Sequence, residues 1–236
     1  MSSRSTTARW AGALYLAAAV LMVLSYMYFP GLFAGSASVT AGKIAAHETL
    51  YRASVLVSFA SQLLFLFVVL ALYELFRDVD ARLARAMVVL VGVGVAAEIV
   101  NIANHMSHIL LSGNADFAAA FTKEQRDTLA DGVLVLGTNL GRFLTAFWGL
   151  WLFPFGLLTI KSGFLPRILG VLLMLAGLGY VMTCVTYILF PEQLPAVSRI
   201  AMPLYFGEVP IILWLLVMGA RDGVPGPSRS AQPRLG

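Results

Sequence analysis

Long apolar segments separated by short polar stretches run along the whole chain. Each segment is long enough to cross the hydrocarbon core of a membrane as an α-helix, for which about 20 residues suffice. The pattern predicts transmembrane helices over residues 10–29, 44–76, 81–112, 129–160, 165–190 and 204–220, with loops at 30–43 and 191–203. The predicted fold class is therefore all-α, a polytopic transmembrane helical bundle of about six helices that forms a single domain over residues 1–221.

The polar stretches between the predicted helices indicate how the bundle is oriented. Ten Lys and Arg residues fall on the side that carries both termini, against five on the opposite side. Because Lys and Arg accumulate in cytoplasmic loops, both termini are predicted to be cytoplasmic, in a multi-pass protein of the bacterial inner membrane. Residues 222–236, rich in Gly, Pro, Ser and Arg, are predicted to form a disordered cytoplasmic tail. The first apolar segment is longer than the core of a typical signal peptide, so we expect it to be retained as a helix.

The composition agrees with a membrane protein. Hydrophobic residues make up 59% of the chain and charged residues only 12%, whereas soluble domains are about one quarter charged. The net charge of +4 does not indicate nucleic-acid binding, because the basic residues are distributed by side of the membrane. The single cysteine, Cys184, excludes an internal disulfide.

One predicted helix, residues 81–112, carries a polar stripe inside an otherwise apolar sequence. Glu98, Asn101, His105 and His108 fall on one helical face about 80° wide, and Asn104 lies beside it. A carboxylate near the middle of a bilayer costs several kcal/mol unless it is paired or protonated. The stripe must therefore face protein or trapped water, which predicts a polar pocket within the membrane.

Other polar residues fall in the outer halves of their predicted helices. They are His47, Glu48, Asn139, Arg142, Tyr180 and Glu208. We expect these side chains to gather with the polar stripe at one depth, in a cavity that opens toward the external leaflet. Asn101, Asn104 and Asn139 would orient a substrate, and His108, Arg142, Trp148, Tyr180, His47 and Glu48 would complete its binding site.

Several stretches resemble a bacterial multi-pass membrane family of unknown function. They are His47-Glu48-Thr-Leu-Tyr51-Arg52, Asn104-His105, Ser162-Gly163-Phe-Leu-Pro166-Arg167-Ile-Leu-Gly170, and Gly207-Glu208 ahead of Leu213-Trp214-Leu-Leu-Val-Met-Gly219. The likeness covers most of residues 8–221 and implies no reaction. In size, helix count and intramembrane acids the chain is also similar to small integral-membrane terpene cyclases of meroterpenoid pathways, an architectural likeness without matching motifs.

Glu98 allows two interpretations, and Glu208 shares both. In the first, the carboxyl group pairs with Arg142 or belongs to a hydrogen-bond network that holds helices together. In the second, burial keeps it protonated, so that it can donate a proton as a general acid. In that scheme Glu98 is the acid, and Glu208 or His105 is its catalytic partner.

The histidines leave three interpretations open. His105 and His108, one helical turn apart, could bind a transition metal together with Glu98 or His47, although a pair of histidines at this spacing is a weak signal. They could equally form interfacial hydrogen bonds or relay protons. We predict no cofactor otherwise.

These residues suggest an integral membrane enzyme that acts on a lipid or isoprenoid molecule taken from the bilayer. The sequence offers a buried proton donor but no set of residues typical of nucleophilic catalysis. This suits acid-initiated cyclisation or isomerisation, with aromatic side chains shielding a carbocation. The alternatives are a small transporter or sensor that relays protons through the same Glu and His residues, and a histidine-based membrane metalloprotein. No nucleic-acid partner is expected.

Overall fold

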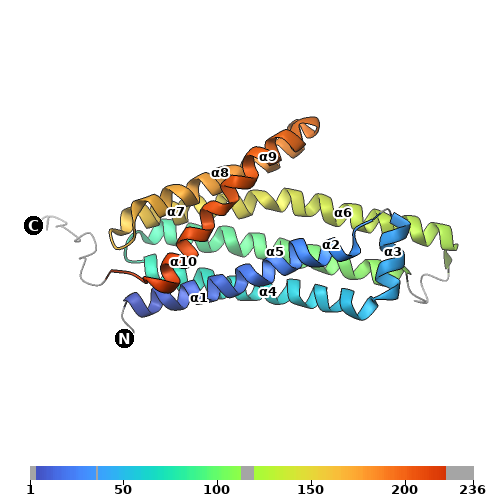
Figure 1. Ribbon diagram of the computed structural model, residues 1–236, viewed down its shortest axis with the longest axis horizontal. Helices are drawn as coiled ribbons and strands as arrows, with labels where there is room; N and C mark the ends of the chain where they lie inside the picture. Colours follow the sequence, from blue (N-terminus) through green and yellow to red (C-terminus); the bar gives the residue numbers. More distant parts are fainter. Residues whose placement is uncertain (1–3, 36, 113–119, 222–236) are drawn as a thin grey trace, which may run out of the picture.

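The structure is a computed structural model that describes residues 4–35, 37–112 and 120–221. Within these ranges it is all-helical, and six helical segments are long and apolar enough to cross a membrane. The chain belongs to the class of multi-pass membrane proteins, as its hydrophobic pattern predicts. The segments lie side by side in an elongated bundle with both termini at the same end (Figure 1).

The first three spans lie between Arg4 and Ser112. The first joins α1 (Arg4–Val23), a π-helix η1 (Leu24–Tyr28) and α2 (Phe29–Phe33). A short helix, α3 (Ala37–Ala46), packs across the end of the bundle away from the termini (Figure 1). The second and third spans are α4 (Glu48–Phe76) and α5 (Ala81–Ser112).

The last three spans follow Thr122, and two of them consist of more than one helical element. The fourth span is α6 (Lys123–Leu150) continued by α7 (Leu152–Ser162), and the fifth is α8 (Arg167–Leu189). The sixth passes from the 3-10 turn η3 (Pro191–Gln193) through α9 (Leu194–Tyr205) and η4 (Phe206–Glu208) into α10 (Val209–Val217). In Figure 1, α9 and the end of α8 project from the side of the bundle.

Two segments predicted as loops are helical. Residues 37–43 of the expected loop at 30–43 belong to α3, and most of 191–203 belongs to α9. The first helix also continues past Pro30 to Phe33, because the π-helix η1 directly before this proline changes the local hydrogen bonding and so accommodates its ring and its missing N–H. Helical backbone satisfies its own hydrogen bonds, and this favours helices over loops near a membrane.

The fourth helix begins earlier than expected, at Lys123, and a capping box explains the boundary. The Gln125 backbone N–H donates to Thr122 Oγ1 over 3.2 Å, and the Thr122 N–H donates to Gln125 Oε1 over 2.9 Å. These two bonds satisfy donors that a helix start leaves without partners. Residues 123–128, which precede the expected helix, thus belong to the start of α6, and residues 113–119 lie outside the described ranges.

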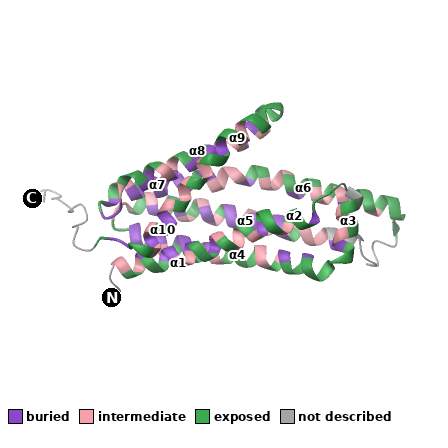
Figure 2. Ribbon diagram, viewed as in Figure 1, coloured by how far each residue is buried: buried purple, intermediate pink, exposed green. Residues whose placement is uncertain are grey.

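The hydrophobic core occupies the half of the bundle nearer the termini, where buried residues line the inner helix faces (Figure 2). Aromatic rings form its centre: Phe65 contacts Trp148 and Trp151, both with ring centroids 5.3 Å apart. Helices α6 and α8 approach closely at two glycines, since a Cβ atom added to Gly149 would stand 2.7 Å from the Gly177 carbonyl oxygen. Small residues of this kind permit close helix packing in membranes.

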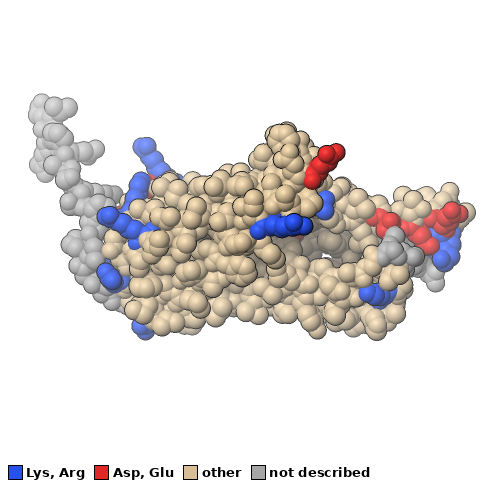
Figure 3. All heavy atoms as spheres, turned by 45° about the horizontal axis from the view of Figure 1, so that its top comes forward, with Lys and Arg blue, Asp and Glu red and all other residues tan. Residues whose placement is uncertain are grey.

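Charged side chains gather at the two ends of the molecule, and a few of both signs also lie between them near the middle of the view (Figure 3). The end that carries the termini displays chiefly Lys and Arg in this view, while the opposite end displays both signs. At the end with the termini, Lys161 Nζ donates to Asp80 Oδ2 over 2.9 Å, tying the turn before α5 to the end of α7. This bond and the Leu83 backbone N–H lower the pKa of Asp80 below its ordinary value.

Candidate functional site

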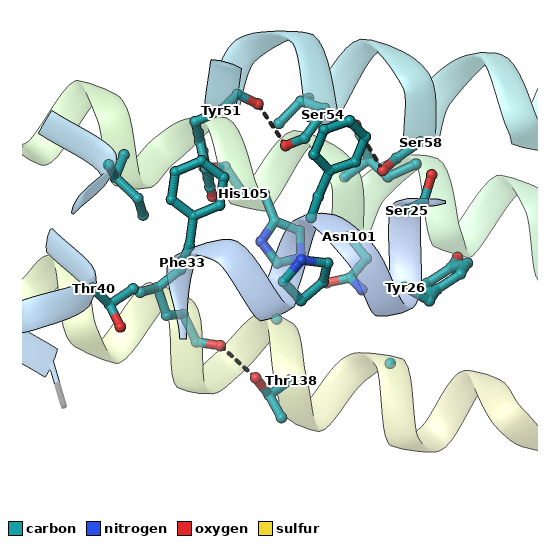
Figure 4. A pocket seen from close by; sticks show the side chains of 18 of the residues that line it. Ser25, Tyr26, Phe33, Thr40, Tyr51, Ser54, Ser58, Asn101, His105 and Thr138 are labelled. Atoms are coloured by element: carbon teal, nitrogen blue, oxygen red, sulfur yellow. Dashed lines mark hydrogen bonds between the residues drawn. The ribbon is translucent and has the colours of Figure 1, made fainter. Parts of the chain in front are cut away.

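A cavity of about 540 Å³ lies in the half of the bundle away from the termini. Its wall is built from η1 and α2, α3, α4, α5 and α6 (Figure 4). The polar residues that line it are Ser25, Tyr26, Thr40, Tyr51, Ser54, Ser58, Glu98, Asn101, His105 and Thr138. A volume of this size is typical of sites that bind small molecules.

Three of the four residues of the predicted polar stripe line this cavity. Glu98 is only 3% exposed and Asn101 only 4% exposed, and His105 follows one turn further along α5. Asn101 and His105 reach into the same space as Phe33 of α2 (Figure 4). The side chain of His108, the fourth residue, lies outside the described part of the structure.

Glu98 belongs to a line of polar groups that crosses three helices. Asn101 Nδ2 donates to Glu98 Oε1 over 3.4 Å, and the Tyr26 hydroxyl lies beside the same carboxyl group. Gln62 Nε2, from α4, donates to Tyr26 Oη over 3.1 Å. Tyr26 is a site residue that the sequence analysis missed, because tyrosines are common in membrane helices as interfacial residues and do not by themselves indicate a site.

The Asn101 amide oxygen has no hydrogen-bond partner among the described residues. A buried carbonyl oxygen without a partner costs free energy, and such atoms in native structures call for an explanation. Because Asn101 lines the cavity, a bound molecule that donates a hydrogen bond would satisfy it.

The G-x-x-x-G pair of α6 allows α5 and α6 to meet at this wall. A Cβ atom on Gly137 would stand 3.1 Å from Asn104 Nδ2 and 3.4 Å from Asn101 Oδ1, and one on Gly141 would stand 3.8 Å from Asn101 Nδ2. Asn104 Nδ2 donates to the Val133 carbonyl oxygen over 2.9 Å. The structure thus gives Asn104 an interhelical bond and does not place it in the cavity lining.

A stripe of hydroxyl groups on α4 forms the back of the cavity. Tyr51, Ser54 and Ser58 all line it (Figure 4). Their spacing of three and four residues, continued by Ser61, puts them on one helical face. The pattern is readable in the sequence, and a search for polar residues at helical spacing would have found it.

The cavity opens to the side of the bundle. Its exposed lining residues belong to η1, α2, the connection between α2 and α3, and α6: Tyr26 is 48% exposed, and Pro30, Ala34, Gly35 and Thr138 are also exposed. On the opposite wall, Ser54 and Asn101 are buried. The surface drawn in Figure 3 is hollowed toward the end that carries α3. A side opening of this kind would connect the cavity with the lipid bilayer.

Glu208 lies at a different place from Glu98. Tyr15 Oη donates to Glu208 Oε2 over 2.5 Å, and Tyr180 lies beside this carboxyl group with its ring stacked on Tyr205 at 4.2 Å. Tyr15 and Tyr26, which meet the two acids, are eleven residues apart on the first span. That separation corresponds to about 16 Å along a helix. The structure therefore does not place Glu208 and Tyr180 in the lining of the cavity that holds Glu98.

Arg142 does not pair with either acid. Its guanidinium group stands 5.0 Å from the centre of the Tyr187 ring, and the Tyr187 hydroxyl donates to Asn139 Oδ1 over 2.8 Å. Among the described residues no ion pair joins Arg142 to Glu98 or Glu208. A cation over an aromatic face is a favourable alternative. Arg142 and Asn139 thus lie outside the cavity lining.

The remaining predicted site residues also lie elsewhere. Trp148 packs against the core through Phe65. His47 is exposed at the start of α4, and Glu48 pairs with Arg52 over 2.7 Å on the surface. Within the described ranges, no three His, Cys, Asp or Glu side chains converge in a way that could hold a metal ion. A metal site at His105 and His108 stays a prediction, because the His108 side chain is not described.

The fold and the buried cavity define a multi-pass helical membrane protein with a polar intramembrane pocket. Residues 10–219 match the family described as "Domain of unknown function (DUF4386)", and the chain belongs to this family. An uncharacterized protein of Archaeoglobus fulgidus is 34% identical over 79 residues, which cover 32% of this chain and 43% of that protein. The chain thus matches less than half the length of that relative. No solved structure matches the chain significantly.

Proposed function

We propose that the protein is an integral membrane enzyme that acts on a lipidic or isoprenoid molecule in the cavity, with Glu98 as the proton donor. The observation that supports this most is the placement of one buried carboxyl group on the wall of a side-opening cavity, next to an amide oxygen without a partner among the described residues. A carboxyl group shielded from water is suited to donate a proton. The side opening suits a substrate that arrives from the bilayer.

The proposed step is an isomerisation or cyclisation started by protonation. The Glu98 carboxyl group gives its proton to one carbon of a substrate double bond, which forms a C–H bond and leaves a carbocation on the other carbon. Aromatic faces stabilise cations, and Tyr26, Phe29, Phe33 and Tyr51 line the cavity. Loss of a proton from the rearranged cation to the Glu98 carboxylate forms the product double bond and restores the acid, so no further reactant is consumed.

Deuterium transfer from solvent tests this step even while the substrate is unidentified. The purified protein is incubated in D2O with a total lipid extract of the membranes in which it is expressed, and the lipids are analysed by mass spectrometry. The proposal predicts a lipid that gains deuterium at carbon with the wild-type protein and with Glu98→Asp at a lower rate, but not with Glu98→Gln. Absence of any protein-dependent deuterium gain would contradict the proposal.

A second candidate function is proton-coupled transport, and one observation favours it. The first span is interrupted beside the cavity by the π-helix Leu24–Tyr28, followed by Pro30 and Gly31. π-Helices are frequent at functional sites, and interrupted helices are typical of transporter binding sites. A pH-sensitive dye inside proteoliposomes would report proton movement that Glu98→Gln abolishes. Such movement without lipid conversion would favour transport over the enzyme.

A further inference from the structure

We propose that the cavity selects ligands whose polar end donates hydrogen bonds and carries no negative charge, such as a hydroxyl or ammonium group. This inference rests on the proposed function for its site, and it concerns which class of lipid the site accepts. It would exclude phosphate- and carboxylate-bearing lipids, including isoprenoid diphosphates, as occupants.

Four Ser and Thr hydroxyl groups on the wall donate their protons to carbonyl oxygens of their own helical segments, whereas the Tyr51 hydroxyl donates to the His105 carbonyl oxygen of α5. Ser25 Oγ donates to the Leu21 carbonyl oxygen over 2.8 Å, and Ser54 Oγ donates to that of Tyr51 over 2.6 Å. Thr138 Oγ1 donates in the same way to the Leu134 carbonyl oxygen over 3.0 Å. Ser58 Oγ donates to the Ser54 carbonyl oxygen over 2.9 Å. A hydroxyl group has one proton and two acceptor lone pairs, so each of these oxygens retains the capacity to accept.

The amide of Asn101 adds a stronger acceptor to the wall, where its oxygen lies at the α5–α6 contact beside Gly137. Its Nδ2 donates to Glu98, while its Oδ1 has no partner among the described residues. Gln62 Nε2 already donates to the Tyr26 hydroxyl oxygen, which leaves the Tyr26 proton beside Glu98. The groups around Glu98 can therefore accept more hydrogen bonds than they receive. A ligand with hydroxyl or ammonium protons complements such a wall.

The described residues that line the cavity include no Lys or Arg, and His105 is the one basic side chain among them. These residues therefore offer an anion no permanent positive charge. Lys43 Nζ lies near the mouth but donates to the Ala34 carbonyl oxygen over 2.7 Å, and Arg142 stands on Tyr187 outside the lining. An anionic group would enter a poorly hydrated site that offers chiefly oxygen acceptors and a carboxyl group, and this is strongly unfavourable.

Three amphiphiles with chains of twelve carbons test the inference: dodecylamine, a dodecanoyl monoglyceride and dodecyl phosphate. Binding to the full-length protein in one detergent is measured by native mass spectrometry. We expect the amine or the monoglyceride, or both, to bind, and the phosphate to bind at least tenfold more weakly. Phosphate binding equal to or tighter than both others would overturn the inference, as would binding by none of the three.

Two variants show whether the binding occurs at this wall. Asn101→Leu removes the free acceptor and should weaken donor binding about tenfold, the effect of one lost hydrogen bond. Asn139→Leu makes the same chemical change outside the lining and should leave binding unchanged. Equal effects of the two variants would refute the assignment to this cavity.

Glu98→Gln separates this inference from the proposed function. It retains an acceptor oxygen, so monoglyceride binding should persist in a variant that no longer transfers deuterium. If the amine alone binds and Glu98→Gln abolishes its binding, Glu98 acts as a carboxylate counter-charge. The proton-donor function would then fail while the inference on ligand class stands. Turnover of an anionic lipid would instead refute the inference on ligand class and leave the proton-donor function standing.

Discussion

Replacing Gly137 by alanine tests whether the close approach of α5 and α6 shapes the cavity wall. An added methyl group would stand 3.1 Å from Asn104 Nδ2 and 3.3 Å from His105 Cε1. Both contacts are tighter than ordinary carbon–nitrogen or carbon–carbon packing, so the two side chains or the two helices must shift. Gly132, five residues earlier on α6, has nothing within 4 Å of such a methyl group and provides the matched control.

The two substitutions should change stability in opposite directions. Alanine is favoured over glycine in a helix by up to about 1 kcal/mol, which both variants gain. Overpacking costs about 1–3 kcal/mol, and only Gly137→Ala incurs it. We therefore expect Gly132→Ala to stabilise slightly and Gly137→Ala to destabilise by about 1 kcal/mol, a difference of about 2 kcal/mol between the variants.

The free energy of unfolding of both variants can be measured by SDS titration in mixed micelles with far-UV circular dichroism. Native mass spectrometry then compares their binding of the dodecanoyl monoglyceride, which should weaken in Gly137→Ala alone because Asn101 Oδ1 lies 3.4 Å from the added atom. Equal stabilities of the two variants would show that α5 and α6 are not in close contact at Gly137.

Three further changes address the rest of the bundle. The hydrogen bond from Lys161 lowers the pKa of Asp80 in the folded protein. The bond therefore stabilises the fold above the ordinary pKa of 3.8, and this stabilisation is lost as the pH falls through the lower folded value. Lys161→Met should remove less than about 1 kcal/mol of this pH-dependent stability. Tyr15→Phe leaves Glu208 without its 2.5 Å donor and should reduce thermal stability by about 1–3 kcal/mol without altering deuterium transfer at the cavity. Arg142→Gln should not abolish deuterium transfer, and adding it to Glu98→Gln should not raise the stability of that variant. A gain in stability would show that Arg142 and Glu98 form an ion pair after all.

The membrane spans and the polar stripe could be predicted because both depend on local periodicity. Six apolar segments long enough to cross a bilayer are present in the structure, and three stripe residues, Glu98, Asn101 and His105, face one cavity. A carboxyl group in an apolar helix has few low-energy environments, so its sequence context alone indicates a protein-lined pocket.

Which residues meet across helices could not be predicted in the same way. Depth in the membrane depends on where each span begins and on the breaks within it, and the side from which a residue faces its neighbours depends on packing. The sequence predicts Glu98 and Glu208 at one depth, yet Glu98 lies beside Tyr26 and Glu208 beside Tyr15, eleven residues apart on the first span. Arg142 was expected to seek a carboxylate and instead stands over Tyr187, a contact that no spacing in the sequence encodes.

The most direct test of the central claim compares Glu98→Gln with Glu208→Gln in the deuterium-transfer measurement. Both variants remove one intramembrane acid and keep its shape, but only Glu98 lines the cavity. We predict that Glu98→Gln lowers the rate by about 10²–10⁴-fold, the usual contribution of a general acid, while Glu208→Gln retains it. Loss of transfer in Glu208→Gln with full transfer in Glu98→Gln would contradict the account and move the site to the Tyr15–Glu208 contact.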